Sequence, residues 1–98
     1  MEWIYARGIP IEAQFLYRKA LDLSQRGNDE SALQYLMQAV FIAPKYGKAF
    51  FEMGNCLARL GRYREAREKY ERASHIDPDI PEVITNDLPG INPSTGRR

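Results

Sequence analysis

Residues 50–78, FFEMGNCLARLGRYREAREKYERASHIDP, combine helical spacing of apolar side chains with two helix-ending signals. Phe50 and Leu57 lie seven residues apart, a spacing that places both on one face of an α-helix. Gly61 ends that helix, because glycine adopts the left-handed cap conformation at little cost. A second helix follows and ends before Pro78, which cannot continue it. The stretch predicts a helical hairpin with helices over 46–60 and 63–76.

The same pattern occurs a second time, 34 residues earlier in the chain. When residues 13–46 are aligned with 47–80, six pairs are identical: Leu23 and Leu57, Gly27 and Gly61, Ala32 and Ala66, Ala39 and Ala73, Ile42 and Ile76, and Pro44 and Pro78. The earlier copy predicts helices over 11–26 and 29–43, with Asn28 as the cap of the second. Internal repetition at this period is typical of helical-repeat proteins.

Small residues recur where the two helices of each hairpin are expected to face each other. Ala20 and Gly54 hold equivalent positions in the first helices, and Ala32 and Ala66 do so in the second. Side chains this small let two helix backbones approach closely, while larger ones such as Tyr70 fill the space beside them. A larger residue at Ala66 is expected to cost about 1–3 kcal/mol through overpacking.

Composition narrows the class of protein. The chain has 98 residues, a formal net charge of +1 and a single cysteine. This length suits one small domain. The balanced charge argues against nucleic-acid binding, and one cysteine supports neither an internal disulfide nor a Cys-rich zinc site. Because neither a signal peptide nor an apolar run of membrane-spanning length is visible, we expect a cytoplasmic protein that does not bind membranes.

The repeated residues resemble the tetratricopeptide repeat (TPR) pattern. The second copy carries that pattern as Phe50-x-x-Met53-Gly54-x-x-Leu57, then Ala66-x-x-x-Tyr70, then Pro78. The first copy departs from it, since it lacks the first aromatic residue and has Lys19 where leucine is usual. The resemblance implies an all-α solenoid of two helical hairpins that serves as a scaffold for other proteins. Family members that grip the acidic tail of heat-shock chaperones use a three-repeat clamp, which only Asn55 matches here, so that ligand is disfavoured.

Two repeats are few for a stable stack, so the flanking segments are expected to cover its ends. We expect an N-terminal extension at 1–12, repeats at 13–46 and 47–80, a capping helix at 81–90 and a disordered tail at 91–98. The helix over 29–43 carries surplus apolar residues outside its main stripe, namely Tyr35, Met37 and Phe41. This surplus predicts that the N-terminal segment or another chain packs against that helix.

Candidate catalytic and metal sites are better interpreted as structural features. Cys56 and His75 are expected to be offset by about 10 Å along antiparallel helices, too far for a nucleophile and its base. Cys56 is interpreted as a small buried apolar residue. The sequence His75-x-Asp77-x-Asp79 offers too few ligands for a metal and suits a helix end followed by a turn. We therefore expect no enzymatic activity, no cofactor and no metal.

The surface left for function is the concave groove lined by the first helix of each repeat. Tyr17 and Phe51 are predicted to form its aromatic floor, and Asn55 and Arg59 to hydrogen-bond a peptide backbone or a carboxylate. The predicted groove residues are Gln14, Tyr17, Leu21, Gln25, Lys48, Phe51, Asn55 and Arg59. This set favours a protein or peptide ligand. Two alternatives stay open: a capping segment covers the aromatic residues, or the same surfaces join copies of the chain into a homodimer or larger oligomer.

Overall fold

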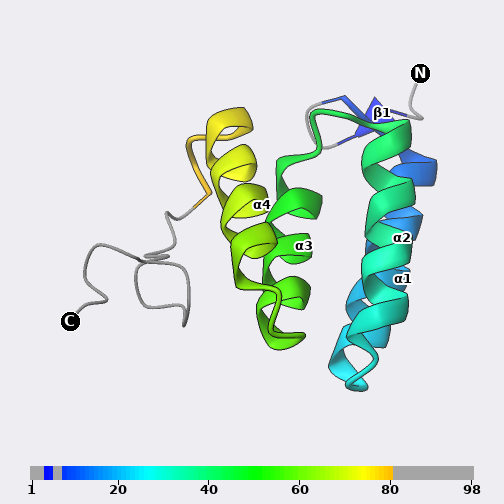
Figure 1. Cartoon of the computed structure of the whole chain (residues 1–98). Coiled ribbons are helices and arrows are strands. Elements are labelled where there is room, and N and C mark those ends of the chain that lie inside the picture. The colour runs from blue at the N-terminus through cyan, green and yellow to red at the C-terminus, as the bar shows by residue number, and fades with distance from the viewer. Residues whose placement is uncertain (1–3, 6–7, 81–98) are drawn as a thin grey trace.

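Helical hairpins make up most of the described chain (Figure 1). The structure is a computed structural model that describes residues 4–5 and 8–80. Its helices are α1 (Ile11–Gln25), α2 (Asp29–Ile42), α3 (Gly47–Arg59) and α4 (Tyr63–Ile76). The all-α prediction is confirmed, and each helix lies within one residue of its expected ends. α1 packs on α2 and α3 on α4, and contact between α2 and α3 joins the two hairpins.

Both hairpins close with the same hydrogen-bonded turn. Gly27 and Gly61 take left-handed backbone conformations, with φ of 83° and 84°. In the first turn the amide of Asn28 donates to the carbonyl of Leu23 at 2.9 Å, and the equivalent bond in the second turn is 2.8 Å. The Asn28 side chain also accepts a hydrogen bond from the amide of Ser31 at 3.3 Å, which confirms its predicted role as a cap. These contacts satisfy backbone groups that a helix end leaves unpaired.

Within each hairpin the helices approach through small residues. Ala32 and Ala66 are completely buried, and Ala20 is 1% exposed. Gly54 lies so close to the ring of Tyr70 that a Cβ added there would be 2.6 Å from it. Larger side chains complete the core, which includes Leu33, Leu36, Tyr46, Phe50, Met53 and Leu57.

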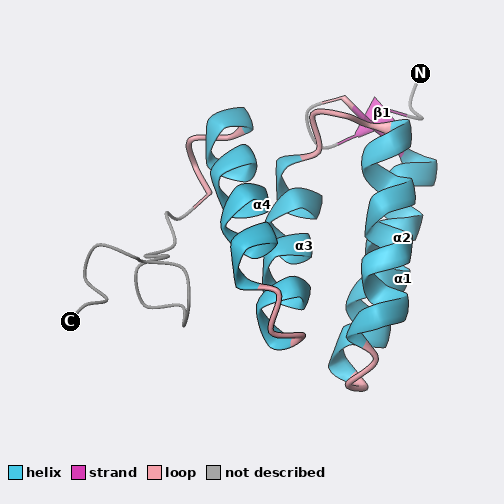
Figure 2. Cartoon of the chain, in the orientation of Figure 1, coloured by secondary structure: helices cyan, strands magenta, loops and turns pink. Residues whose placement is uncertain are grey.

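A short β-hairpin precedes α1, a feature that the sequence did not predict (Figure 2). β1 (Ile4–Tyr5) and β2 (Ile9–Pro10) pair antiparallel, with Ile4 opposite Pro10 and Tyr5 opposite Ile9. Gly8 has a φ of 88°, a conformation that a turn between strands uses readily. The Gln14 side chain donates to the carbonyl of Ile9 at 2.9 Å and ties this hairpin to α1.

The surplus apolar residues of α2 have different environments. Tyr35 is partly buried and packs against the core. Met37 is 52% exposed and Phe41 is 86% exposed, so the chain leaves these two largely uncovered. The predicted capping helix at 81–90 and disordered tail at 91–98 lie outside the described residues. Among the residues that are described, no helix is long and apolar enough to cross a membrane.

Candidate functional site

An open groove with a volume of about 770 Å³ lies where the two hairpins and the N-terminal strands meet. Its walls come from β2, from the first half of α1, from the link into α3 and the start of α3 itself, and from the turn after α4. The lining residues are Ile9, Gln14, Tyr17, Arg18, Lys45, Tyr46, Gly47, Lys48, Phe51, Asp77, Asp79 and Ile80. The groove therefore brings together four of the eight groove residues predicted from the sequence, namely Gln14, Tyr17, Lys48 and Phe51.

Tyr17 and Phe51, the two aromatic residues predicted for the groove, each pack against a tyrosine. Tyr17 packs against Tyr46, with ring centroids 5.2 Å apart. Phe51 packs against Tyr70, with centroids 5.6 Å apart. Tyr17 thus packs against another residue of the groove, whereas the aromatic neighbour of Phe51 lies on α4 outside the groove lining. The sequence spacing predicted Tyr17 and Phe51 as groove residues and missed both tyrosine partners.

Burial changes the acidity of the tyrosine pair. It raises the pKa of Tyr17 from its ordinary value of 10.0 to about 12, and the negative charge of Glu52 and then Tyr46 contribute in the same direction. Burial also raises the pKa of Tyr46, against an opposing effect of the Arg18 charge. Both phenols are therefore neutral hydrogen-bonding groups at neutral pH.

We expect the Tyr17 phenol to titrate near pH 12. Because its pKa is higher in the folded chain than in the unfolded chain, its contribution to stability is present below pH 10.0 and is lost as the pH rises through about 12. Phenolate absorbance followed against pH, in the protein and in Tyr17→Phe, measures this. Tyr63→Phe on α4 is the control. Loss of a group that ionises near pH 10 in Tyr17→Phe would contradict the assignment.

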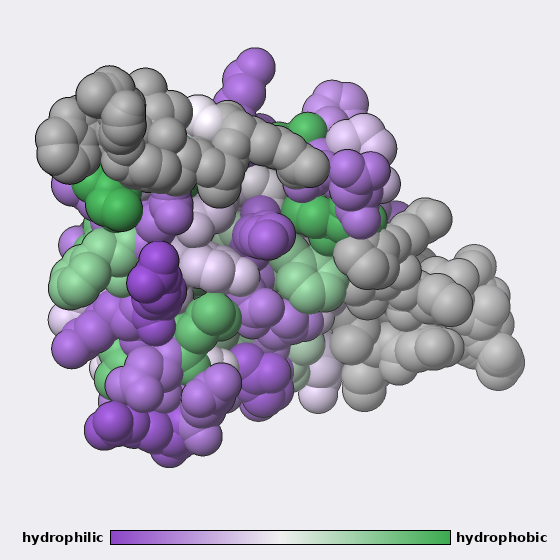
Figure 3. Space-filling view, turned by 180° about the vertical axis from the view of Figure 1, so that it is seen from behind, coloured by the Kyte–Doolittle hydropathy of each residue, from purple (hydrophilic) through white to green (hydrophobic). Residues whose placement is uncertain are grey.

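Cations line part of the groove. Arg18, Lys45 and Lys48 are all exposed, and none of them forms an ion pair with another described residue. Asp77 and Asp79 line the same groove, and the amide of Asp79 donates to the Asp77 carboxylate at 3.0 Å. The groove therefore combines aromatic rings, exposed cations and carboxylates in its lining. Figure 3, which views the molecule from behind, shows hydrophilic and apolar side chains intermixed over the described surface.

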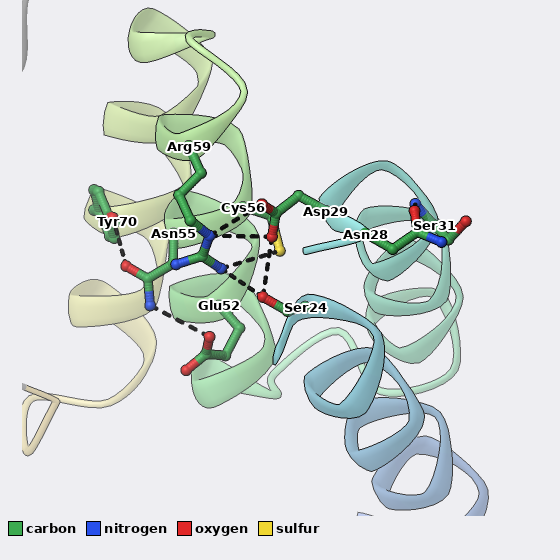
Figure 4. Close-up of polar contacts among 9 residues, drawn as sticks. All are labelled: Ser24, Asn28, Asp29, Ser31, Glu52, Asn55, Cys56, Arg59 and Tyr70. Atoms are coloured by element: carbon green, nitrogen blue, oxygen red, sulfur yellow. Dashed lines mark hydrogen bonds and ion pairs between the residues drawn. The ribbon is translucent and has the colours of Figure 1, made fainter. Parts of the chain in front are cut away.

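Arg59 takes part in a junction between the repeats (Figure 4). Its Nε lies 3.1 Å from both carboxylate oxygens of Asp29, and its Nη2 donates to the hydroxyl of Ser24 at 2.6 Å. Ser24 donates in turn to Asp29 at 3.0 Å. Asp29 is only 9% exposed, so its charge is balanced by a residue of the other repeat.

The remaining predicted groove residues lie away from the 770 Å³ groove. Asn55 accepts a hydrogen bond from the Tyr70 hydroxyl at 2.6 Å and donates to Glu52 at 3.3 Å. On α1, Leu21 is partly buried and Gln25 is exposed. These residues continue along the first helices of the two repeats, beyond the aromatic floor.

Cys56 lies inside the inter-repeat junction. It is completely buried, which confirms its interpretation as a small core residue. Burial raises the pKa of its thiol, and the Asp29 charge raises it further. A thiol held protonated is a poor nucleophile. Among the described residues, no group of three or more metal-binding side chains is found.

The antiparallel helical hairpins of this chain stack side by side and leave an open groove. This arrangement defines a helical-repeat protein of the α-solenoid class. Residues 47–80 match the family described as tetratricopeptide repeat. The chain belongs to the tetratricopeptide repeat family. It therefore belongs to a class of protein-interaction modules that are typically non-catalytic.

Several curated proteins are similar to this chain. Small glutamine-rich tetratricopeptide repeat-containing protein 2 of Mycosarcoma maydis is 38% identical over 69 residues, which cover 70% of this chain and 20% of that protein. An uncharacterized protein of Methanocaldococcus jannaschii is 35% identical over 69 residues, covering 70% of this chain and 80% of the archaeal protein. A DnaJ homolog subfamily C member 7 homolog of Dictyostelium discoideum is 29% identical over 76 residues and is matched over 14% of its length. The chain thus corresponds to most of the archaeal relative and to a small part of the other two.

Proposed function

We propose that this protein binds a peptide segment of a partner protein in the groove between its hairpins. The observation that carries the proposal is the groove itself, in which rings from both repeats lie beside exposed cations. A cytoplasmic location is part of the proposal and is supported by the sequence alone.

The lining chemistry supports a particular kind of segment. Tyr17 and Phe51 offer apolar area at low conformational cost, as aromatic anchors do at interfaces. Arg18, Lys45 and Lys48 offer positive charge to an acidic side chain, and such charge-assisted hydrogen bonds are stronger than neutral ones. We infer a segment with an apolar residue next to an aspartate or glutamate.

A phage-displayed library of random peptides, selected on the immobilised protein, tests this. We expect enrichment of peptides that place an apolar residue beside an acidic one. The best peptide, carrying a fluorophore, should bind Lys48→Glu at least about tenfold more weakly, a loss of about 1.4 kcal/mol. The matched control is Arg64→Glu, which makes the same charge change on the exposed surface of α4 and should bind as the parent protein does.

Two outcomes would contradict the proposal. One is no enrichment over a blank surface. The other is an equal loss of binding in Lys48→Glu and Arg64→Glu, which would indicate a general charge effect. Self-assembly through the groove is the second use that the sequence left open. It predicts that Lys48→Glu lowers the molecular mass in sedimentation, whereas a peptide groove leaves the mass unchanged.

A further inference from the structure

The first hairpin lies at one end of the row of helices (Figure 1), and it carries exposed apolar side chains. On α1, Phe15 is 69% exposed and Ile11 is 43% exposed. On α2, Ile42 is 43% exposed. Ile11 and Phe15 lie four residues apart on one side of α1, and we call the end of the first hairpin around them the outer end face.

The equivalent positions in the second repeat are buried. The residue 34 positions after Phe15 is Ala49, and the one 34 positions after Lys19 is Met53. Ala49 is completely buried and Met53 is 3% exposed, on the helix that packs against the first hairpin. The outer end face of α1 is therefore equivalent to a side of α3 that is buried within the fold.

Two features argue against a further repeat stacking there in the same way. Lys19 would occupy the position of Met53, and burial of an unpaired ammonium group is costly. A second copy stacked head-to-tail would have to present α4, whose exposed residues are largely charged, as in the ion pair between Arg67 and Glu71 at 3.0 Å. Among the described residues, the other end of the row thus lacks an apolar counterpart, and a self-complementary contact is favoured.

We propose that the outer end face binds the same face of a second copy of this chain, with the two α1 helices antiparallel about a two-fold axis near Phe15. At 100° per residue, Glu12 and Lys19 lie about 60° and 40° to the same side of Phe15. Along the helix they lie about 4.5 Å before it and about 6 Å after it. A two-fold rotation therefore brings Glu12 beside the partner's Lys19, and the same pair forms a second time across the axis.

The size of the face sets the strength of this contact. Two helices of 15 and 14 residues form a face of about 22 by 20 Å, or about 450 Å² in projection. A standard stable interface buries about 800 Å² on each partner. We therefore expect a reversible dimer with a dissociation constant in the micromolar range, separate from peptide binding in the groove.

Charge exchange between Glu12 and Lys19 tests the proposed symmetry. In Glu12→Lys each interface pair becomes lysine with lysine, and in Lys19→Glu each becomes glutamate with glutamate. Each single variant should dimerise at least about tenfold more weakly than the parent protein in sedimentation equilibrium. An equal mixture of the two variants should recover the dimer, because every pair across the axis is then of opposite charge.

The matched controls are Arg64→Glu and Glu68→Lys, an exposed pair on α4, which should dimerise as the parent does alone and mixed. Phe15→Ser should give a monomer that melts with the same helical circular dichroism signal as the parent. A parent protein that stays monomeric across the micromolar range would overturn the proposal. So would a dimer that survives both single variants, or a mixture that stays monomeric.

Discussion

Gly54→Ala is expected to lower the free energy of unfolding by about 2 kcal/mol, although alanine favours helices by about 1 kcal/mol over glycine. The new Cβ would lie 2.6 and 2.7 Å from two carbons of the Tyr70 ring. That ring cannot move away easily, because its hydroxyl donates to Asn55 at 2.6 Å and the ring packs against Phe51, with centroids 5.6 Å apart. The substitution therefore destabilises the protein by disturbing the packing between α3 and α4.

The first repeat supplies the control for this prediction. Its equivalent pair is Ala20 with Leu36, and both are 1% exposed. Gly54→Ala combined with Tyr70→Leu recreates that pair in the second hairpin. Urea unfolding of the two single variants and the double variant gives a thermodynamic cycle, in which the double variant should be more stable than the sum of the single losses predicts. Strict additivity would show that the ring is not the obstacle.

Arg59→Met is expected to lower the free energy of unfolding by about 2 kcal/mol. The side chain of Asp29 is 11% exposed and would lose the guanidinium that lies 3.1 Å from its carboxylate. A buried carboxylate without a charge partner is costly. The Arg59 side chain is itself 49% exposed, so water moderates the loss.

Arg62→Met provides the comparison, since it removes the same charge three residues later. Arg62 pairs with Glu65 at 2.6 Å, and both side chains are about half exposed. An ion pair in solvent contributes little, so the Arg62 variant should unfold at nearly the same urea concentration as the parent. Equal destabilisation by the two variants would contradict a special role for the pair between the repeats.

Local signals predicted the helices well and the contacts between repeats poorly. Gly27 and Gly61 determine their turns through backbone conformation alone, so the ends of the helices could be read from neighbouring residues. Arg59 and Asp29 are 30 residues apart, and no spacing rule joins them. Their contact depends on how one hairpin is rotated against the other, which the repeat pattern does not state.

The candidate groove was likewise predicted from the sequence only in part. Helical spacing predicted Gln14, Tyr17, Lys48 and Phe51 on one side of the first helices, and the structure brings these four together along one groove. The tyrosine partners were missed because Tyr46 lies in a link and Tyr70 on another helix. The exposed cations of the groove were missed in part for the same reason, since Lys45 precedes α3. Short strands such as β1 and β2 lack the alternation that identifies longer strands.

The two glycine turns also bear on how the chain folds. Each closes a hairpin whose helices are neighbours in sequence, so the entropy lost on closing the loop is small. Contacts of this kind favour rapid folding, and either hairpin can form without waiting for the other. The hydrogen bonds of Arg59 can form only after both are in place. The contact between the repeats therefore forms last in folding, after each hairpin has closed.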